Sequence, residues 1–167
     1  MRDVDALLTS PSAALASALE ASALAEDRNG VVGVGVDVVS VPRMARLVSE
    51  GGSAFLDRGW TSEESAEADG DPERLATRWA AKEAVMKCLG LGISDLDPRN
   101  IEISSSKSGA PSVSLRGSAA ERARSLGISK LDVSASHESG WATAIAVASA
   151  RMGQEDLEVP HQRKDRS

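Results

Sequence analysis

Residues 78–90 (RWAAKEAVMKCLG) constrain the fold of this chain more than any other stretch. Their apolar spacing predicts one long amphipathic helix that carries several charged side chains. Side chains four residues apart lie on one face of a helix, so Trp79, Glu83 and Lys87 share a stripe. A carboxylate and an ammonium this close suit a site for a metal ion and a phosphate. A Glu–Lys pair at this spacing is also common on solvated helix faces, so both interpretations stay open.

A second segment, residues 31–39, is an apolar, β-branched run that predicts a short buried strand. One charge, Asp37, interrupts the run, and a carboxylate is costly to bury unless it is paired, hydrogen-bonded or bound to a metal. The alternative is that Asp37 ends the strand and caps a helix beginning near Val41. Gly33 and Gly35 remove side chains beside Asp37, so either a ligand or another part of the backbone can approach closely.

The composition favours one domain of an enzyme from a reducing compartment. Hydrophobic residues make up 41% of the 167 residues and aromatic residues only 2%, so the core must be built from Ala, Val, Leu and Ile. The single cysteine, Cys88, excludes an internal disulfide framework, and we interpret it as a packing residue rather than a reactive thiol. No apolar run approaches the length of a membrane span, and the N-terminus lacks a secretory pattern, so we expect a cytoplasmic protein.

Hydrophobic periodicity and turn residues predict an α+β fold rather than a doubly wound sheet. Thr61 and Glu64 have the spacing of a capping box, and Asp71 with Pro72 marks the start of the long helix. The glycines at 51–52 and residues 107–109 predict turns. We expect helices over residues 12–25, 42–49, from Thr61, from Pro72 to Gly90 or Gly92, and 118–126, and strands over residues 31–39, 101–104, 111–115, 131–136 and 141–148.

Both segments belong to a longer pattern that resembles the holo-acyl-carrier-protein synthases, the small class of 4′-phosphopantetheinyl transferases. The matching pieces, in order, are GVGVDVVSVPRM, FLDRGWTSEE, RLATRWAAKEAVMKCLGLGI, SGAPSVSL and LDVSASHESGWATAIAVA. The resemblance implies the fold of these transferases, a small antiparallel sheet packed against one long helix and shorter helices. It leaves residues 1–29 as an N-terminal extension, partly helical or disordered, residues 30–150 as the transferase domain, and residues 151–167 as a polar tail that we expect to be disordered.

The resemblance implies transfer of 4′-phosphopantetheine from coenzyme A to a serine of an apo acyl carrier protein, with release of adenosine 3′,5′-bisphosphate. It implies Mg²⁺ ligands at Asp37 and Glu83, since this ion usually takes one or two carboxylates together with phosphate oxygens and waters. The implied coenzyme A contacts are Arg78, Lys82, Lys87 and His137, and the implied catalytic residues are Glu83, Lys87, His137 and Glu138.

Removal of the serine proton needs a base within hydrogen-bond reach, directly or through water. Three candidates stay open: Glu138, His137 and a metal-bound water. A lone histidine such as His137 is more often a structural hydrogen-bonding residue than a catalyst. Trp79 stands where the family usually has Phe, and the simpler interpretation is that it packs its helix against the sheet.

The net charge of −6 argues against a general nucleic-acid-binding protein. Acyl carrier proteins are typically acidic as well, so binding one requires a local positive patch. Arg43 and Arg46, three residues apart on the helix expected from residue 42, offer such a patch, although a solvated helix face explains them equally well. The resemblance implies that Arg43 contacts the acidic recognition helix of the carrier, with Arg46 as a supplement, and that the protein is a homotrimer. It leaves open whether the carrier serves fatty acid or polyketide synthesis.

Two other functions compete with this prediction. A non-catalytic carrier-binding module of the same fold is expected to have lost a metal ligand or a lysine of the K-E-A motif, yet all are present. A nucleotide-binding domain built on Gly33 and Gly35 lacks the third glycine of the dinucleotide fingerprint, and Asp37 follows too soon for a ribose contact.

Overall fold

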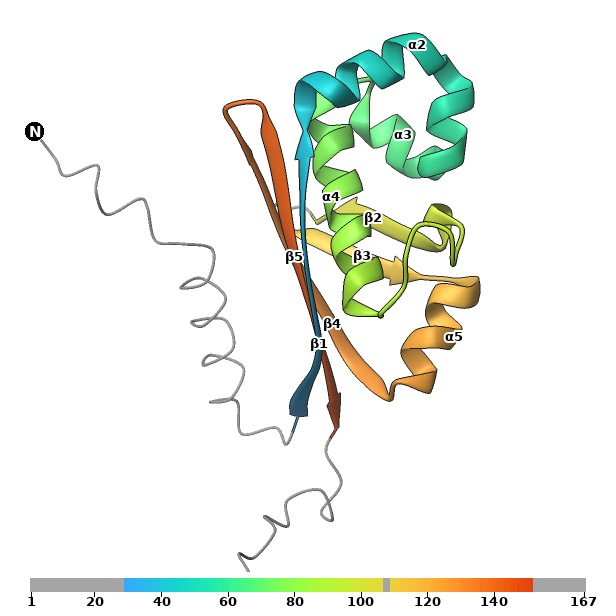
Figure 1. Ribbon diagram of the computed structural model, residues 1–167, viewed down its shortest axis with the longest axis vertical. Helices are drawn as coiled ribbons and strands as arrows, with labels where there is room; N and C mark the ends of the chain where they lie inside the picture. The colour runs from blue at the N-terminus through green and yellow to red at the C-terminus, as the bar shows by residue number, and fades with distance from the viewer. Residues whose placement is uncertain (1–28, 107–108, 152–167) are drawn as a thin grey trace, which may run out of the picture. The chain divides into compact units, whose positions relative to one another are not determined.

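The computed structural model describes residues 29–106 and 109–151, so the helix expected over residues 12–25 and the tail from residue 152 lie outside the described residues. Residues Val31–Ala150 form one compact unit. The elements, in chain order, are β1 (Asn29–Ser40), α2 (Val41–Gly59), α3 (Ser62–Ala68), α4 (Pro72–Cys88), the 3₁₀ turn η2 (Pro98–Asn100), β2 (Ile101–Ser105), β3 (Pro111–Leu115), α5 (Gly117–Ser125), β4 (Ile128–Glu138) and β5 (Trp141–Arg151). All of them except η2 are labelled in Figure 1.

The strands form two small sheets. A three-stranded sheet has the order β1-β5-β4, and β2 pairs with β3 in a second sheet. Both hairpins are antiparallel, with His137 opposite Ala142 in one and Ile103 opposite Val113 in the other. The β4–β5 turn has positive φ at both of its central residues, as a tight two-residue hairpin requires. The α+β fold with small antiparallel sheets is therefore confirmed, and both hairpins form where the sequence predicts them.

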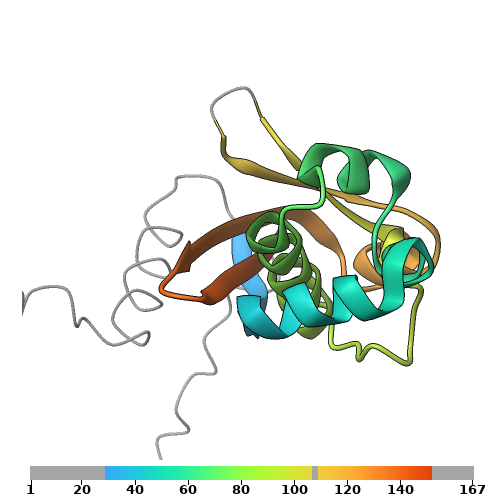
Figure 2. The same ribbon diagram turned by 90° about the horizontal axis from the view of Figure 1, so that it is seen from above.

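Helix α4 is the centre of the fold. It packs against β4, β2, α2 and α3, and Figure 2 shows it between the strands of the larger sheet and α2. The strand β5 turns a row of small buried side chains inward, namely Ala142, Ala144, Ala146 and Ala148. Such a row lets the sheet approach the helix closely, because nothing larger than a methyl group separates them. The prediction of a core built from Ala, Val, Leu and Ile is confirmed for most of this cluster, which also holds Met86 and Cys88.

A second cluster holds most of the aromatic residues. Trp60 is buried at the end of α2, with its ring centroid 5.5 Å from that of Phe55 and 5.2 Å from that of Trp79. Trp79 is therefore a packing residue, but its ring partner is Trp60 at the end of α2 rather than the sheet as predicted. This cluster fixes the start of α4 against α2.

The helix boundaries follow the predicted caps, with one exception. The Thr61–Glu64 capping box forms in both directions, and the Asp71 carboxylate accepts a hydrogen bond from Glu73 N at the start of α4. The exception is α2, which does not end at the glycine pair but continues to Gly59 across a break at Gly52 (φ 54°, ψ −147°). Burial of the aromatic cluster beyond this break explains why the chain returns to helix. No helix among the described residues is long and apolar enough to cross a membrane.

The glycines of β1 bring this strand directly onto α4. A Cβ on Gly35 would overlap the Ala84 carbonyl oxygen and lie 2.6 Å from Cys88 N, and one on Gly33 would overlap the Cys88 carbonyl oxygen. The neighbour that approaches these glycines is therefore the backbone of a helix, so they are not available to cradle a nucleotide phosphate. Cys88 is buried at this contact, and burial raises the pKa of its thiol, which agrees with a packing role.

Replacing Gly35 with alanine tests this contact. Because the added methyl group meets rigid backbone atoms, we expect Gly35→Ala to lower the free energy of unfolding by about 2 kcal/mol or more. Denaturant unfolding of the purified protein measures the change. Gly92→Ala is the control, since its Cβ would meet only side-chain atoms, Asp95 Oδ2 at 3.3 Å and Ser94 Oγ at 4.0 Å, and side chains can move. Equal stability of the two variants would contradict the proposed tight contact.

Candidate active site

Asp37 projects from β1 toward α4 and is mostly buried. Its Oδ1 lies 2.7 Å from Lys87 Nζ, and its buried Oδ2 accepts no hydrogen bond. The alternative role, as the cap of the next helix, belongs instead to Ser40, whose hydroxyl oxygen accepts a hydrogen bond from Arg43 N. Asp37 is thus a carboxylate held inside the fold, with its charge compensated by Lys87 and its Oδ2 without a hydrogen bond.

Glu83 meets Asp37 from the facing side of α4. Burial raises the pKa of the half-buried Glu83 carboxyl to about 7, with further increases from its hydrogen bond to Asp37 and from the charge of Asp37. Lys87 and a hydrogen bond from Trp79 oppose this increase. Two carboxyl groups in contact resist joint ionisation, so the Glu83 carboxyl keeps its proton to a higher pH than an ordinary glutamate does. The structure thus brings together the two acids that the sequence places far apart.

Lys87 completes the cluster. Its ammonium donates to Asp37 Oδ1 at 2.7 Å and to the Val36 carbonyl oxygen at 3.0 Å. The side chain crosses from α4 to β1, so a solvated pair with Glu83 along the helix does not account for its position. About half of the Lys87 side chain remains exposed, which leaves it free to turn toward a ligand.

The donor set fits a divalent cation with a preference for oxygen ligands. Mg²⁺ sites commonly use one or two carboxylates, with waters and substrate oxygens filling the remaining positions. Asp37 Oδ2 lacks a donor, and the Glu83 carboxyl lies against Asp37. Among residues 29–106 and 109–151, no group of three or more His, Cys, Asp or Glu side chains could hold a metal ion. The protein can therefore offer two carboxylates here, and a ligand must supply the rest.

A cleft of about 390 Å³ lies on another side of α4, lined by Glu67, Arg74, Arg78 and Ser105. Arg78 is buried, and its Nη2 donates to Glu67 Oε2 at 2.8 Å, whereas its buried Nε has no partner. Arg74 and Arg78 are four residues apart and therefore share one face of the helix. Two guanidinium groups at a cleft suit a phosphate, because each presents a planar fork of donors.

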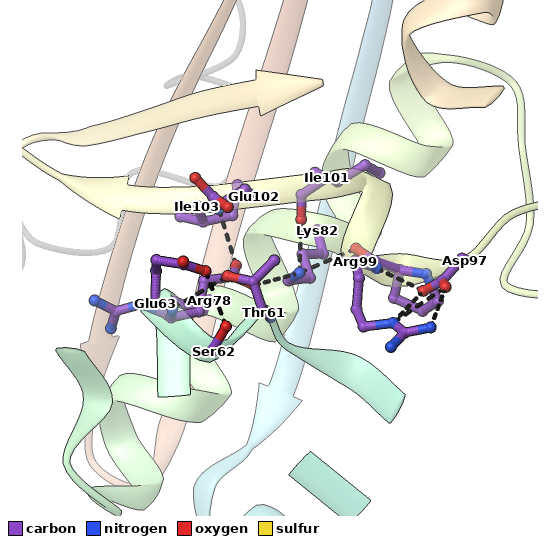
Figure 3. Close-up of polar contacts among 12 residues, drawn as sticks. Thr61, Ser62, Glu63, Arg78, Lys82, Asp97, Arg99, Ile101, Glu102 and Ile103 are labelled. Carbon is purple, nitrogen blue, oxygen red and sulfur yellow. Dashed lines mark hydrogen bonds and ion pairs between the residues drawn. The ribbon is translucent and has the colours of Figure 1, made fainter. Parts of the chain in front are cut away.

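Lys82, an implied coenzyme A contact, is enclosed in the core of the structure. Its ammonium is fully buried and donates to the carbonyl oxygens of Pro98 and Ile101 at 3.0 and 2.6 Å; the Ile101 contact can be followed in Figure 3. The third partner is Glu64, at 2.7 Å. All three N–H groups are therefore in use, and burial lowers the pKa of the ammonium. This geometry favours a structural role for Lys82, and its contact with coenzyme A stays a prediction.

His137 and Glu138 end β4 beside the first turns of α4. His137 Nδ1 lies 3.4 Å from the Thr77 hydroxyl, and its Nε2 lies 3.6 Å from a Glu73 carboxylate oxygen. Glu138 is exposed and accepts a hydrogen bond from the Ser139 hydroxyl at the hairpin turn. Among the contacts of the described residues, none joins either side chain to Asp37 or Glu83. The structure thus keeps these candidates for the base apart from the carboxylate pair within one chain.

Arg43 and Arg46 lie exposed in the first turns of α2. The hydrogen bond from Val41 N to the Gly140 carbonyl oxygen ties this end of α2 to the β4–β5 turn. Both arginine side chains are therefore available to a partner near the hairpin that carries His137.

Sequence reasoning missed three residues of the cleft, Glu67, Arg74 and Ser105. Arg74 precedes Arg78 by one helical turn, and this spacing could have indicated a second cation on the same face. Glu67 carries no local signal, because its partner is brought to it only by the packing of α3 on α4.

The titration of Glu83 provides a test of the carboxylate pair. Asp37→Asn removes the neighbouring charge, so we expect the pKa of Glu83 to fall from about 7 toward the ordinary glutamate range, although burial still holds it up. Lys87→Met removes a stabilising cation, so the pKa should rise instead. Carboxyl ¹³C chemical shifts followed against pH in metal-free buffer measure both changes. A Glu83 pKa that is the same in all three proteins would show that the two carboxyl groups do not interact.

Comparison with known proteins agrees with this geometry. The family model of the 4′-phosphopantetheinyl transferase superfamily matches residues 33–146. The holo-[acyl-carrier-protein] synthase of Herpetosiphon aurantiacus is 38% identical over 120 residues, covering 68% of this chain and 94% of that protein. The crystal structure of the Neisseria meningitidis synthase matches with a TM-score of 0.64 and 36% identity, over 71% of this chain and 98% of that chain. The Helicobacter pylori synthase in complex with coenzyme A matches with a TM-score of 0.63 and 32% identity, over 69% and 98%. The resemblance seen in the sequence is thereby confirmed, and the chain belongs to the 4′-phosphopantetheinyl transferase superfamily.

Proposed function

We propose that this protein is a holo-acyl-carrier-protein synthase. It transfers the 4′-phosphopantetheine group of coenzyme A to a serine of an apo acyl carrier protein and releases adenosine 3′,5′-bisphosphate. The single observation that carries the proposal is the meeting of Asp37 and Glu83 beside Lys87. The relatives that bear the name of this activity, and the related structure with coenzyme A bound, support the choice of substrates.

The carboxylates are proposed as the protein ligands of Mg²⁺. When bound, the ion shields the pyrophosphate of coenzyme A and polarises the bond that breaks. Asp37 and Glu83 fix its position through a strand and a helix that touch, so the pair is rigid. A site built on a strand and a helix positions its charged groups more accurately than a site on loops does.

Lys87 is proposed to bind the pyrophosphate. Its exposed ammonium, now paired with Asp37, lies where it can turn to a phosphate oxygen and stabilise the negative charge of the leaving group. Arg78 is proposed to contact a phosphate of coenzyme A at the cleft that it lines with Arg74. Coenzyme A thus extends over two faces of α4, with the reacting phosphorus at the carboxylate pair.

The serine proton is accepted by His137, by Glu138 or by a water molecule at the metal. All three remain candidates, because His137 and Glu138 lie at the exposed end of the β4–β5 hairpin, where the carrier serine can approach. Thr77 and Glu73 lie beside the two nitrogens of the half-exposed His137 imidazole, so a ligand of this ring would replace one of these two long contacts.

A homotrimer is proposed as the assembly. The face of the larger sheet opposite α4 exposes Val32, Val36 and Val38 of β1, and apolar side chains in a row commonly mark an interface between subunits. The trimer itself rests on the family resemblance. Sedimentation velocity measures the mass in solution, and a stable monomer at micromolar concentration would exclude this assembly.

The cellular context is also proposed from the resemblance. We place the protein in the cytoplasm, where fatty acid and polyketide synthesis both provide acyl carrier proteins. We place the transferase domain at residues 30–150, which leaves residues 1–29 and 151–167 as extensions.

Intact-mass measurement of an apo carrier, incubated with coenzyme A and Mg²⁺, tests the function. The wild type should add the mass of one phosphopantetheine group per carrier. Asp37→Asn and Glu83→Gln should each slow this transfer by about 10²-fold or more, because a single group that stabilises transition-state charge is typically worth that much. Circular dichroism and thermal melts verify that both variants fold.

Asp132→Asn and Glu121→Gln are the matched controls, since both residues are exposed and distant in sequence from the carboxylate pair. They should transfer at the wild-type rate. Coenzyme A binding without any gain of mass by the carrier would favour a nucleotide-binding module, and carrier binding alone would favour a non-catalytic module.

Reversing the charge of Arg43 tests the carrier-binding face. Arg43→Glu should raise the KM for the carrier by about tenfold or more, because it opposes an acidic partner with a like charge. The KM for coenzyme A should stay unchanged. Arg124→Glu, the same change on the exposed face of α5, serves as the control for net charge. A rise in the coenzyme A KM alone would remove Arg43 from the carrier-binding face.

A further inference from the structure

The ion pair between Arg78 and Glu67 joins two residues of unequal burial. The Arg78 side chain is only 9% exposed, whereas that of Glu67 is 43% exposed. Arg78 belongs to the central helix, and Glu67 lies near the end of the short helix α3. A buried guanidinium must keep a partner at all times, because an uncompensated buried charge is costly. An exposed carboxylate has no such requirement, since it can turn into water.

The hydrogen bonds of Arg78 leave part of its donor set unfilled. Nε and Nη2 form one edge of the guanidinium, and Glu67 Oε2 accepts only from Nη2. Nε on the same edge is buried without a partner, while Nη1 reaches the Arg74 carbonyl oxygen at a long 3.5 Å. Glu67 therefore neutralises the charge of Arg78 but leaves the Nε–H donor of its guanidinium without an acceptor. A tetrahedral phosphate, with several oxygens, can accept from both donors of an edge at once.

A second cation borders the same cleft. Arg74 donates to the Glu67 carbonyl oxygen at 3.3 Å and lies 3.5 Å from an Asp71 carboxylate oxygen, yet its side chain is more than half exposed. Ser105, from β2, also lines the cleft and supplies a hydroxyl group. One anion placed in the cleft can thus meet two guanidinium groups and a hydroxyl, a set that favours a doubly charged phosphate over a carboxylate.

We propose that Glu67 is a resident counter-ion of Arg78, which a phosphate group of coenzyme A displaces when it binds, so that Glu67 sets the affinity of the cleft. This inference rests on the proposed function for the identity of the ligand. In physical terms, a phosphate replaces the Glu67 carboxylate as the anion paired with Arg78. The carboxylate holds Arg78 in place while the cleft is free of ligand, and it moves to solvent when a better acceptor arrives. Glu67 thereby acts as a determinant of coenzyme A affinity without touching the reacting phosphorus.

Calorimetric titration with adenosine 3′,5′-bisphosphate, without Mg²⁺ or carrier, tests the exchange directly. Glu67→Gln removes the competing charge and part of the repulsion felt by the ligand, so we expect binding about three- to tenfold tighter than in the wild type. Glu63→Gln is the matched control on the same helix, because Glu63 is exposed and its carboxylate pairs with Ser62 rather than Arg78. The control should stay within about twofold of the wild type, as expected for a screened surface charge.

Thermal melts separate exchange from a purely structural role. Glu67→Gln should lower the melting temperature of the free protein, because Arg78 loses its charged partner, and should enlarge the increase produced by saturating bisphosphate. A lower melting temperature without tighter binding would mean that Glu67 is structural only, and would overturn the proposal. Unchanged or weaker binding would do the same.

Glu67→Asp is a second variant in case the glutamine protein folds poorly. Its shorter side chain keeps the charge near α3 but withdraws it from Arg78, so binding should again tighten. The transfer assay decides the proposed function separately. If the wild type modifies no carrier but Glu67→Gln still binds the bisphosphate more tightly, the proposed transferase function is wrong. The displacement of Glu67 by a phosphate is then still supported. If none of the proteins shows saturable binding, the exchange is excluded.

Discussion

The contact between the backbones of β1 and α4 is the constraint on which the site depends. Gly33 and Gly35 leave no side chain between strand and helix, so the strand lies against the Ala84 and Cys88 backbone. A residue two positions further along an extended strand points to the same face, which directs Asp37 at the helix as well. Its carboxylate meets Glu83 only because the two preceding inward positions are glycines. Close packing here produces both the core and the cluster of charges.

The rotation of α4 about its own axis is fixed by a buried ion pair. Lys82 is held by Glu64 and two carbonyl oxygens, and Glu64 also accepts hydrogen bonds from the backbone of Thr61 and Ile103. Removing one partner from such a pair typically costs about 3–5 kcal/mol, because the other charge is left buried alone. With Lys82 anchored toward α3 and β2, geometry turns Glu83 toward β1. The lysine of the K-E-A motif thus orients the glutamate that follows it.

The sequence predicted those features that are encoded locally. The capping box at Thr61, the start of α4 at Asp71 and the turn of the β4–β5 hairpin each depend on neighbours a few residues away. The shared stripe of Glu83 and Lys87 also follows from helical spacing alone. The structural role of Lys82 carried no local signal, because the partners that occupy its ammonium lie 16 or more residues away in the chain.

Two further features of the structure, the length of α2 and the neighbour of the β1 glycines, also depend on residues far away in the chain. The glycines at 51–52 carry a strong turn signal, yet α2 continues because the aromatic side chains beyond them are buried together. Two glycines in β1 predicted a close approach, but the identity of the approaching group, a helix and not a ligand, needed the structure. Patterns in the sequence thus located the charged groups, and packing decided which of them meet.

The site balances its charges internally through two pairs built in the same way. In each pair the mostly buried partner is fixed by the core, Asp37 at 11% exposure and Arg78 at 9%. The other partner is long and about half exposed, Lys87 in one pair and Glu67 in the other. A divalent cation and a phosphate have the charges needed to replace these exposed partners. Because each buried charge keeps a counter-ion before and after such a replacement, a highly charged substrate can bind without leaving a buried charge unpaired.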